Sequence, residues 1–156
     1  MVNRGYSSQS AMKESAERLL ENGDGKDVTI LYIGDFDPSG EDMVRDVEDR
    51  LKLLTRHAVA LVVVKLAITQ AQIAQYNPPA NPTKLSDSRA GAFITKHGDA
   101  SYEADALPPD VLAGVVRGAI ERRLDTSLWE EVIEEEELDK LLLRGAAEQV
   151  MQRRQR

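Results

Sequence analysis

Two aspartates, Asp35 and Asp37, directly follow an apolar run at 28–33. Because side chains alternate along an extended chain, both carboxylates point to one side and Phe36 points to the other. Carboxylates this close repel each other, and the pKa of one rises unless a cation lies between them. Oxygen ligands of this kind suit hard cations. The spacing therefore predicts a site for Mg²⁺ or Mn²⁺ at Asp35 and Asp37.

The residues after the aspartates add a second signal. Pro38-Ser39-Gly40 turns the chain into a helix, and the partial positive charge at the start of that helix favours a phosphate near the metal. In open α/β sheets, ligands bind at this edge of the strands. A simpler interpretation stays open, in which an Asp-x-Asp after a strand is only a helix cap and a turn.

Three further acids extend the predicted site. Glu41 lies one turn after the motif and is a candidate catalytic carboxylate, although a glutamate in a first helical turn also fits the helix dipole. Glu103 and Asp105 are candidate accessory acids, with a structural alternative as caps of the helix that follows Pro108.

Basic residues gather near the end of a second apolar run and in the proline-rich loop after it. These basic residues are candidate contacts for phosphate groups, and they are Lys65, Lys84, Arg89 and Lys96. Each also fits a solvated surface position. The chain carries a net charge of −7, so contact with DNA requires this local patch, a bridging metal ion or a partner.

Hydrophobic periodicity and turn residues predict the elements that position these side chains. The predicted strands cover 28–33, 58–66 and 102–106. The predicted helices cover 7–22 (capped by Ser8 or Ser10), 41–56, 70–75 (capped by Thr69), 88–97, 108–124, and a last segment capped by Asp125 or Thr126. The prolines of 77–82 predict a surface loop without regular structure.

Strands that alternate with helices predict an α/β fold with a parallel sheet. We expect about three to four strands flanked by helices, within one domain at 1–125. Residues 126–156 are predicted to form an acidic helix, which packs on that domain or serves as an interaction arm.

Composition excludes several classes of protein. The sequence has no cysteine, which rules out disulfides, thiolate zinc sites and cysteine nucleophiles. No apolar run has the length of a bilayer span, and the beginning of the sequence lacks the apolar centre of a signal peptide. We therefore expect a soluble, cytoplasmic protein without membrane contacts.

The stretch Leu31–Met43, LYIGDFDPSGEDM, resembles the Toprim domain of type IA and type II topoisomerases, primases and OLD-type nucleases. The likeness is nearest to the branch with the topoisomerase VI A subunit and the meiotic double-strand-break protein, and to phage-encoded Toprim proteins. Arg4–Ser8 resembles the glycine-aromatic turn after the first Toprim strand and helix. Tyr76–Arg89 and Glu103–Pro109 resemble later segments of the phage-type proteins. Together these stretches lie within residues 2–128.

The resemblance implies a Toprim-like, Rossmann-like sheet and magnesium-dependent breaking or joining of phosphodiester bonds. Toprim sites use a glutamate on the first strand plus two aspartates, onto which Asp35 and Asp37 map. This sequence has no match for that strand or its glutamate. The resemblance therefore leaves three sources for the missing acid: Glu41, the weaker candidates Glu14 and Glu17, or a partner chain or second copy that completes the bare sheet edge.

Three functions follow from these expectations. The first is a small stand-alone Toprim-like protein that binds Mg²⁺ and nicks or cleaves DNA, which would make it an enzyme of nuclease or topoisomerase type. The second is a catalytically incomplete Toprim module that binds a DNA-processing partner. The third is a phosphatase of the haloacid-dehalogenase type, which has a similar Asp-x-Asp after a strand.

Overall fold

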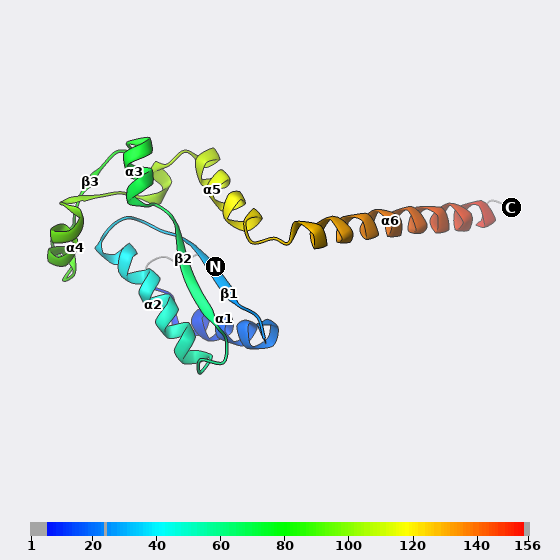
Figure 1. Ribbon diagram of the computed structural model, residues 1–156, viewed down its shortest axis with the longest axis horizontal. Helices are drawn as coiled ribbons and strands as arrows, with labels where there is room; N and C mark the ends of the chain where they lie inside the picture. The colour runs from blue at the N-terminus through cyan, green and yellow to red at the C-terminus, as the bar shows by residue number, and fades with distance from the viewer. Residues whose placement is uncertain (1–5, 24, 155–156) are drawn as a thin grey trace. The chain divides into compact units, whose positions relative to one another are not determined.

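The computed structural model describes residues 6–23 and 25–154. The chain divides into two compact units, the first ending at Ala119 and the second beginning at Ile120. In chain order (Figure 1), the elements of the first unit are α1 (Gln9–Asn22), β1 (Val28–Ile33), α2 (Pro38–Leu54), β2 (Leu61–Ala67), α3 (Gln70–Tyr76), β3 (Asn81–Pro82), α4 (Ala90–His97), β4 (Ala100–Ser101), the 3-10 turn η1 (Ala104–Ala106) and α5 (Pro109–Glu121). The last two residues of α5 belong to the second unit.

β1 and β2 lie side by side as a parallel pair (Figure 1). The ladder begins with a hydrogen bond of 2.8 Å from the Val28 amide to the Ala60 carbonyl. It stays in register to Tyr32 opposite Lys65 and, after a shift, ends with Ile33 opposite Ala67. Parallel neighbours need a crossover connection, which α2 supplies. Both strands therefore end at the same edge, where the Asp-x-Asp motif follows β1.

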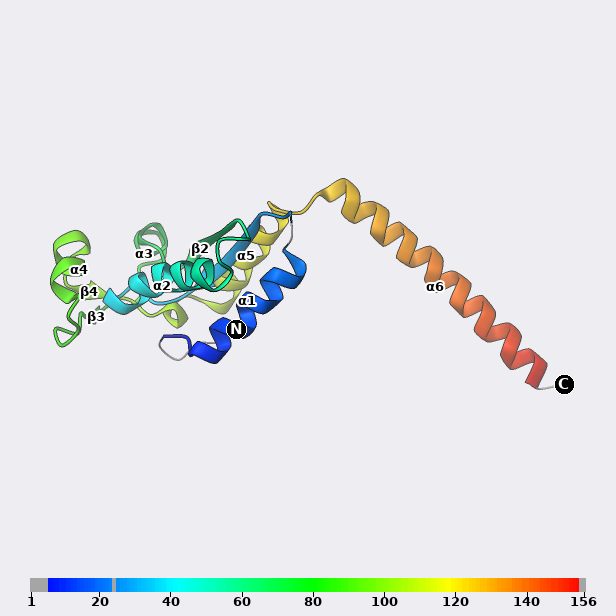
Figure 2. The same ribbon diagram turned by 90° about the horizontal axis from the view of Figure 1, so that it is seen from below.

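α1 and α2 lie beside the two strands (Figure 2). They pack on the strands through a shared apolar cluster. Ser8 caps α1 by accepting a hydrogen bond of 3.2 Å from the Ala11 amide, as predicted. The buried members of the cluster are Met12, Ala16, Leu51 and Leu61, with Leu19, Val28, Ile30, Val47 and Leu54 partly buried around them. This packing fixes the direction in which β1 delivers its aspartates.

A second apolar cluster gathers the segments that follow the strands. Its buried members are Phe36, Ala67, Ile68, Phe93 and Leu107. The Phe36 ring meets the Phe93 ring edge-on at 5.4 Å and the His97 ring at 4.9 Å. Phe36 is therefore an anchor that fixes the backbone between the two aspartates.

The predicted α/β class is confirmed, but fewer parallel strands form than predicted. Among the described residues the parallel sheet has two strands, and β3 and β4 make a separate antiparallel pair. Asn81–Pro82 thus belongs to a short strand, which corrects the prediction of an entirely irregular loop; proline is tolerated on such an edge. The strand predicted at 102–106 is also wrong, because only Tyr102 pairs, in a single bridge with Phe36, before the chain turns into η1.

The other predicted elements are close to the observed ones. α2 begins at Pro38, earlier than predicted, because Asp37 caps it. Thr69 caps α3 with a reciprocal bond to Gln72, as predicted. Of the predicted glycine-aromatic turn at 4–8, residues 4 and 5 lie outside the described residues. No described helix combines the length and apolar character needed to cross a membrane.

The second unit contains one long helix, α6 (Thr126–Arg154). Asp125 caps it, since its Oδ1 accepts hydrogen bonds from the amides of Ser127 and Leu128 at 3.1 and 3.2 Å. Lys140 pairs with Glu136 and Glu137 along the same helix. The role predicted for this helix, as a packed element or an interaction arm, stays a prediction.

Candidate metal and phosphate site

Asp37 is the N-cap of α2. Its Oδ1 accepts hydrogen bonds from the Gly40 amide at 2.6 Å and from the Ser39 hydroxyl at 2.9 Å. The turn is so tight that a Cβ at Gly40 would collide with the Asp35 carbonyl oxygen. The simpler interpretation of the motif therefore holds for one oxygen of Asp37, and glycine is required beside it.

Asp35 is held from the opposite side of the site. Its Oδ1 accepts a hydrogen bond of 2.9 Å from the Ala104 amide, and its carbonyl oxygen accepts one of 2.7 Å from Lys65 Nζ. Phe36 is buried between the aspartates, while both aspartates line the same cleft. This arrangement matches the predicted alternation, with the two carboxylates on one side and the ring on the other.

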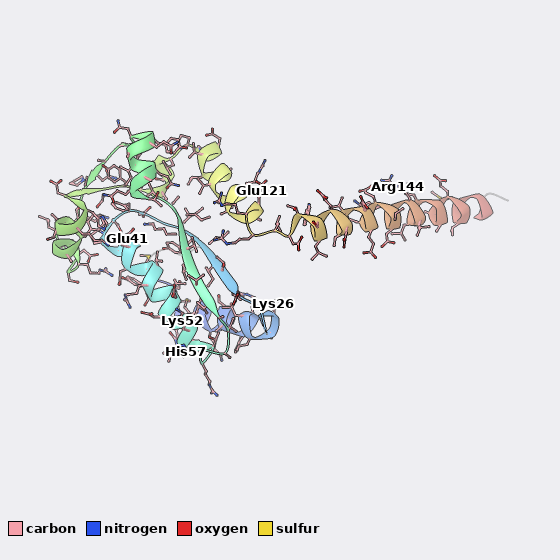
Figure 3. The ribbon with its side chains drawn as sticks, in the orientation of Figure 1. Lys26, Glu41, Lys52, His57, Glu121 and Arg144 are labelled. Atoms are coloured by element: carbon pink, nitrogen blue, oxygen red, sulfur yellow. The ribbon has the colours of Figure 1, made fainter. Side chains whose placement is uncertain are left out.

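Glu41, the predicted substitute glutamate, has a different partner. Its Oε1 lies 2.6 Å from Lys65 Nζ, and that ammonium group also lies 5.5 Å from the centre of the Phe36 ring. Figure 3 shows Glu41 at the start of α2, the position of a first-turn acid that favours the helix dipole. The ion pair occupies both residues, so Glu41 is a structural partner of Lys65, and Lys65 is already neutralised.

A cleft of about 530 Å³ opens beside the aspartates. Acidic and basic groups both line it, together with several hydroxyl groups. The lining residues with such groups are Asp35, Asp37, Ser39, Lys84, Ser86, Asp87, Ser88, Arg89, Ser101, Tyr102 and Glu103. Of the candidate residues predicted from the sequence, Glu103, Lys84 and Arg89 line the same cleft as the aspartates. Asp105 lines a neighbouring groove instead.

Arg89 and Lys84, the two predicted cations in this cleft, differ in whether a carboxylate already holds them. Arg89 is held by Asp87 at 2.8 Å and by Asp42 at 2.9 Å, and its guanidinium lies 5.4 Å from the centre of the Tyr6 ring. Lys84 is exposed and pairs with no carboxylate among the described residues. Lys84 is therefore the cation that is ready to meet an incoming phosphate. Asp87 lies two positions from Arg89, but Asp42 lies 47 positions away, so its contact with Arg89 has no local signal in the sequence.

The pKa of Tyr32 responds to the charges of the two aspartates. Burial raises the pKa of its phenol, and the negative charges of Asp35 and then Asp37 raise it further. Its hydroxyl donates to the Met43 sulfur at 3.5 Å. The carboxylate pair therefore creates a negative potential that reaches back along β1.

Whether a metal ion fits depends on the oxygens that remain. Among the described residues, Oδ2 of Asp35 and Oδ2 of Asp37 make no hydrogen bond, so each aspartate keeps one uncommitted oxygen. The same part of the chain holds no group of three or more acidic or histidine side chains able to enclose a metal. Two oxygens suit a hydrated Mg²⁺, which keeps several water ligands, but they do not form a closed cage.

Other acidic candidates do not supply a third ligand. Glu14 and Glu17 are exposed on α1 and line neither the cleft nor the groove, and Glu17 lies 3.7 Å from Lys13. His97 is the last residue of α4, and its Nδ1 is buried without a hydrogen-bond partner among the described residues. Its ring packs against Phe36 and so supports the motif from behind.

Comparison of this chain with protein-family models, with curated proteins and with solved structures gives no match.

Proposed function

We propose that this chain binds Mg²⁺ or Mn²⁺ through Asp35 and Asp37 and, with that ion, engages the phosphodiester backbone of DNA in a Toprim-like manner. One observation carries the proposal: within residues 6–23 and 25–154, each aspartate keeps an oxygen without a hydrogen bond, in a cleft that also presents the unpaired Lys84. Metal ions and lysines are the usual ligands of phosphate oxygens. The net charge of −7 makes this local chemistry necessary.

In this proposal the two aspartates and Lys84 have different roles. Asp35 and Asp37 would hold the ion through their Oδ2 atoms, and their Oδ1 bonds to Ala104 and Gly40 keep both carboxylates oriented. Lys84 would meet a phosphate oxygen across the cleft. A bound divalent ion would neutralise phosphate charge and lower the pKa of a coordinated water.

Of the two nucleic-acid hypotheses, the incomplete module has the better support. Glu41, the first candidate to replace the missing Toprim glutamate, is paired with Lys65. In the described part of the chain, no three acidic or histidine side chains are grouped so that they could hold a metal ion. We therefore place the chain as a metal-dependent DNA-binding module, for which cleavage requires a further carboxylate from a partner protein.

The test uses variants that keep the local hydrogen bonds. Asn is a good N-cap, so Asp35→Asn/Asp37→Asn removes both charges and preserves the acceptors for Ala104 and Gly40. Asp49→Asn, an exposed acid elsewhere on α2, is the matched control. We expect calorimetric titration with Mg²⁺ and Mn²⁺ to give binding to wild type and Asp49→Asn, and none to the double variant. Binding of a short DNA duplex should follow the same pattern and disappear with a chelator.

Activity assays separate the three functions. Incubation of wild type with supercoiled plasmid and metal should leave the plasmid intact. Nicking that the double variant loses would favour the stand-alone nuclease, and turnover of a small phosphate ester alone would favour the phosphatase. Absence of metal binding by wild type would overturn the proposal in every form.

A further inference from the structure

One edge of β1 pairs with no other strand in the described part of the chain. Because the Val28 amide bonds to Ala60 on β2, the peptide groups alternate, and those of Thr29, Leu31 and Ile33 point away from β2. None of these groups has a hydrogen-bond partner among the described residues. An edge of this kind is a template for another strand.

The side chains of β1 are also incompletely covered. Its sequence, VTILYI, is β-branched and apolar, yet none of its residues is fully buried and Ile33 is 43% exposed. A groove of about 1170 Å³ runs along Ile30–Ile33. Met12 and Leu19 of α1 and Met43 of α2 give it apolar walls. The groove therefore offers unpaired backbone groups and apolar surface in one place.

The charges of the groove are unbalanced. Its lining includes four acids at or beyond the end of β1: Asp35, Asp37, Glu103 and Asp105. None of them forms an ion pair with a lysine or arginine in the described part of the chain. Arg18 is the basic residue in the lining, and its guanidinium donates a hydrogen bond of 3.0 Å to the Ser15 hydroxyl. An occupant thus finds negative charge at the strand's carboxyl end.

We infer that this groove binds an extended peptide segment of a partner protein, which adds to β1 as a strand. The segment is apolar along its length and carries lysine or arginine where it reaches the carboxylates. Backbone hydrogen bonds supply its affinity, and side-chain contacts and charge supply its selectivity. The strand addition stands apart from the metal proposal, since the free edge consists of backbone groups that no metal ligand uses. The charge preference is tested at Glu103 and Asp105, to which the metal proposal assigns no role.

The first test changes the probe and leaves the protein intact. A labelled peptide of alternating valine and threonine that ends in a pair of lysines is titrated with the full chain, and binding is followed by fluorescence anisotropy. N-methylation of alternate amides, which removes the donors of one peptide edge, should weaken binding at least about tenfold. Replacing the lysines by glutamates should weaken it by roughly threefold to tenfold.

The second test changes the protein. Leu31→Pro removes an amide that points to the free edge and leaves the β1–β2 bonds in place; Leu31→Ala shortens the same side chain and keeps that amide. We expect Leu31→Pro to lose peptide binding and Leu31→Ala to retain most of it. Glu103→Lys/Asp105→Lys should reverse the preference, so that the glutamate-ended peptide binds more tightly than the lysine-ended one.

Several results would overturn the inference. If the lysine-ended peptide does not bind, or if its N-methylated form binds equally well, the edge is not the docking surface. If sedimentation shows that the wild-type chain is a dimer that Leu31→Pro dissociates, a second copy occupies the edge instead. If Leu31→Pro fails to fold by circular dichroism, the N-methylated peptide decides the question on wild type.

Discussion

The two outer edges of the β1–β2 sheet differ in the hydrogen bonds of their outward backbone groups. On β2, the outward amide of Val63 donates to Glu48 Oε2 at 3.1 Å, and Glu48 is itself paired with Lys52 of α2. On β1, the equivalent groups have no partner among the described residues. A charged pair that satisfies an edge donor hinders the addition of another strand, so the β2 edge is blocked at Val63 and is called the closed edge below. The β1 edge has no such block among the described residues and is called the open edge.

The same contrast appears in the burial of the two strands. Leu61, Val63, Leu66 and Ala67 of β2 are buried, whereas β1, with a similar apolar composition, has no fully buried residue. Residue type alone therefore does not decide burial; the neighbours of each strand do. The open strand is also the one that ends in the aspartates, so whatever covers it also approaches the candidate site.

The largest predicted effect comes from the side chain that supports the open strand. Met12 is fully buried in the cluster of α1 with the strands and also lines the groove beside β1. We expect Met12→Ala to lower the free energy of unfolding by about 2–5 kcal/mol, measured by urea denaturation. Amide hydrogen exchange should rise more in β1 than in β2. Leu20→Ala, on the same helix but 45% exposed, should change stability little, and equal losses for the two variants would contradict this account.

A smaller effect is expected at the closed edge. Glu48→Ala leaves the Val63 amide without its charged acceptor and should lower the free energy of unfolding by about 1 kcal/mol, since the pair is partly exposed. It also opens the second edge, so self-association should increase in sedimentation experiments. Asp49→Ala is the control on the next residue, where the ion pair with Arg45 is exposed. A destabilisation as large for Asp49→Ala would argue against a special role for Glu48.

Local signals explain what the sequence predicts correctly. Caps such as Ser8, Thr69 and Asp125 and the apolar run 28–33 depend on near neighbours, and they set the element bounds well. The placement of Asp35 and Asp37 at the strand edge follows from the same local pattern.

Long-range contacts explain the rest. The pairing of Glu41 with Lys65 joins residues that are 24 positions apart and depends on the exact register of β1 against β2. Likewise, Tyr102 pairs with Phe36 while the Ala104 amide turns to the Asp35 carboxylate, which ends the strand that the sequence predicts. Neither contact leaves a periodic trace in the sequence.

The closed edge should also respond to pH. The Lys52 ammonium, and then the Val63 amide, hold the pKa of Glu48 below its ordinary value of 4.5. A lowered pKa in the folded state adds stability above the unfolded pKa, and this stability is lost as pH falls through the folded pKa. The stability difference between wild type and Glu48→Gln, from urea midpoints, should therefore shrink below about pH 4.5. A difference that stays constant down to acid pH would show that Glu48 acts through shape alone.

The smallest effect concerns Tyr32, which reports on the open strand. Burial is the main cause of its raised pKa, followed by the charges of Asp35 and Asp37. Asp35→Asn/Asp37→Asn should therefore move the pKa of Tyr32 only part of the way back toward 10.0. Ultraviolet titration measures this shift, with Tyr32→Phe to identify the phenol among the four tyrosines.

The two causes of the Tyr32 shift can be separated on the same residue. A cation bound by the aspartates weakens the charge contribution, so Mg²⁺ should lower the pKa of Tyr32 in wild type and leave the double variant unchanged. Tyr32 lines the groove, so a strand added to β1 deepens its burial. The valine–threonine peptide of the binding test should therefore raise the pKa of Tyr32 in the double variant, where the two aspartate charges are absent. If neither addition moves the pKa of Tyr32, the open edge of β1 and the aspartates beyond it are not binding surfaces for these ligands.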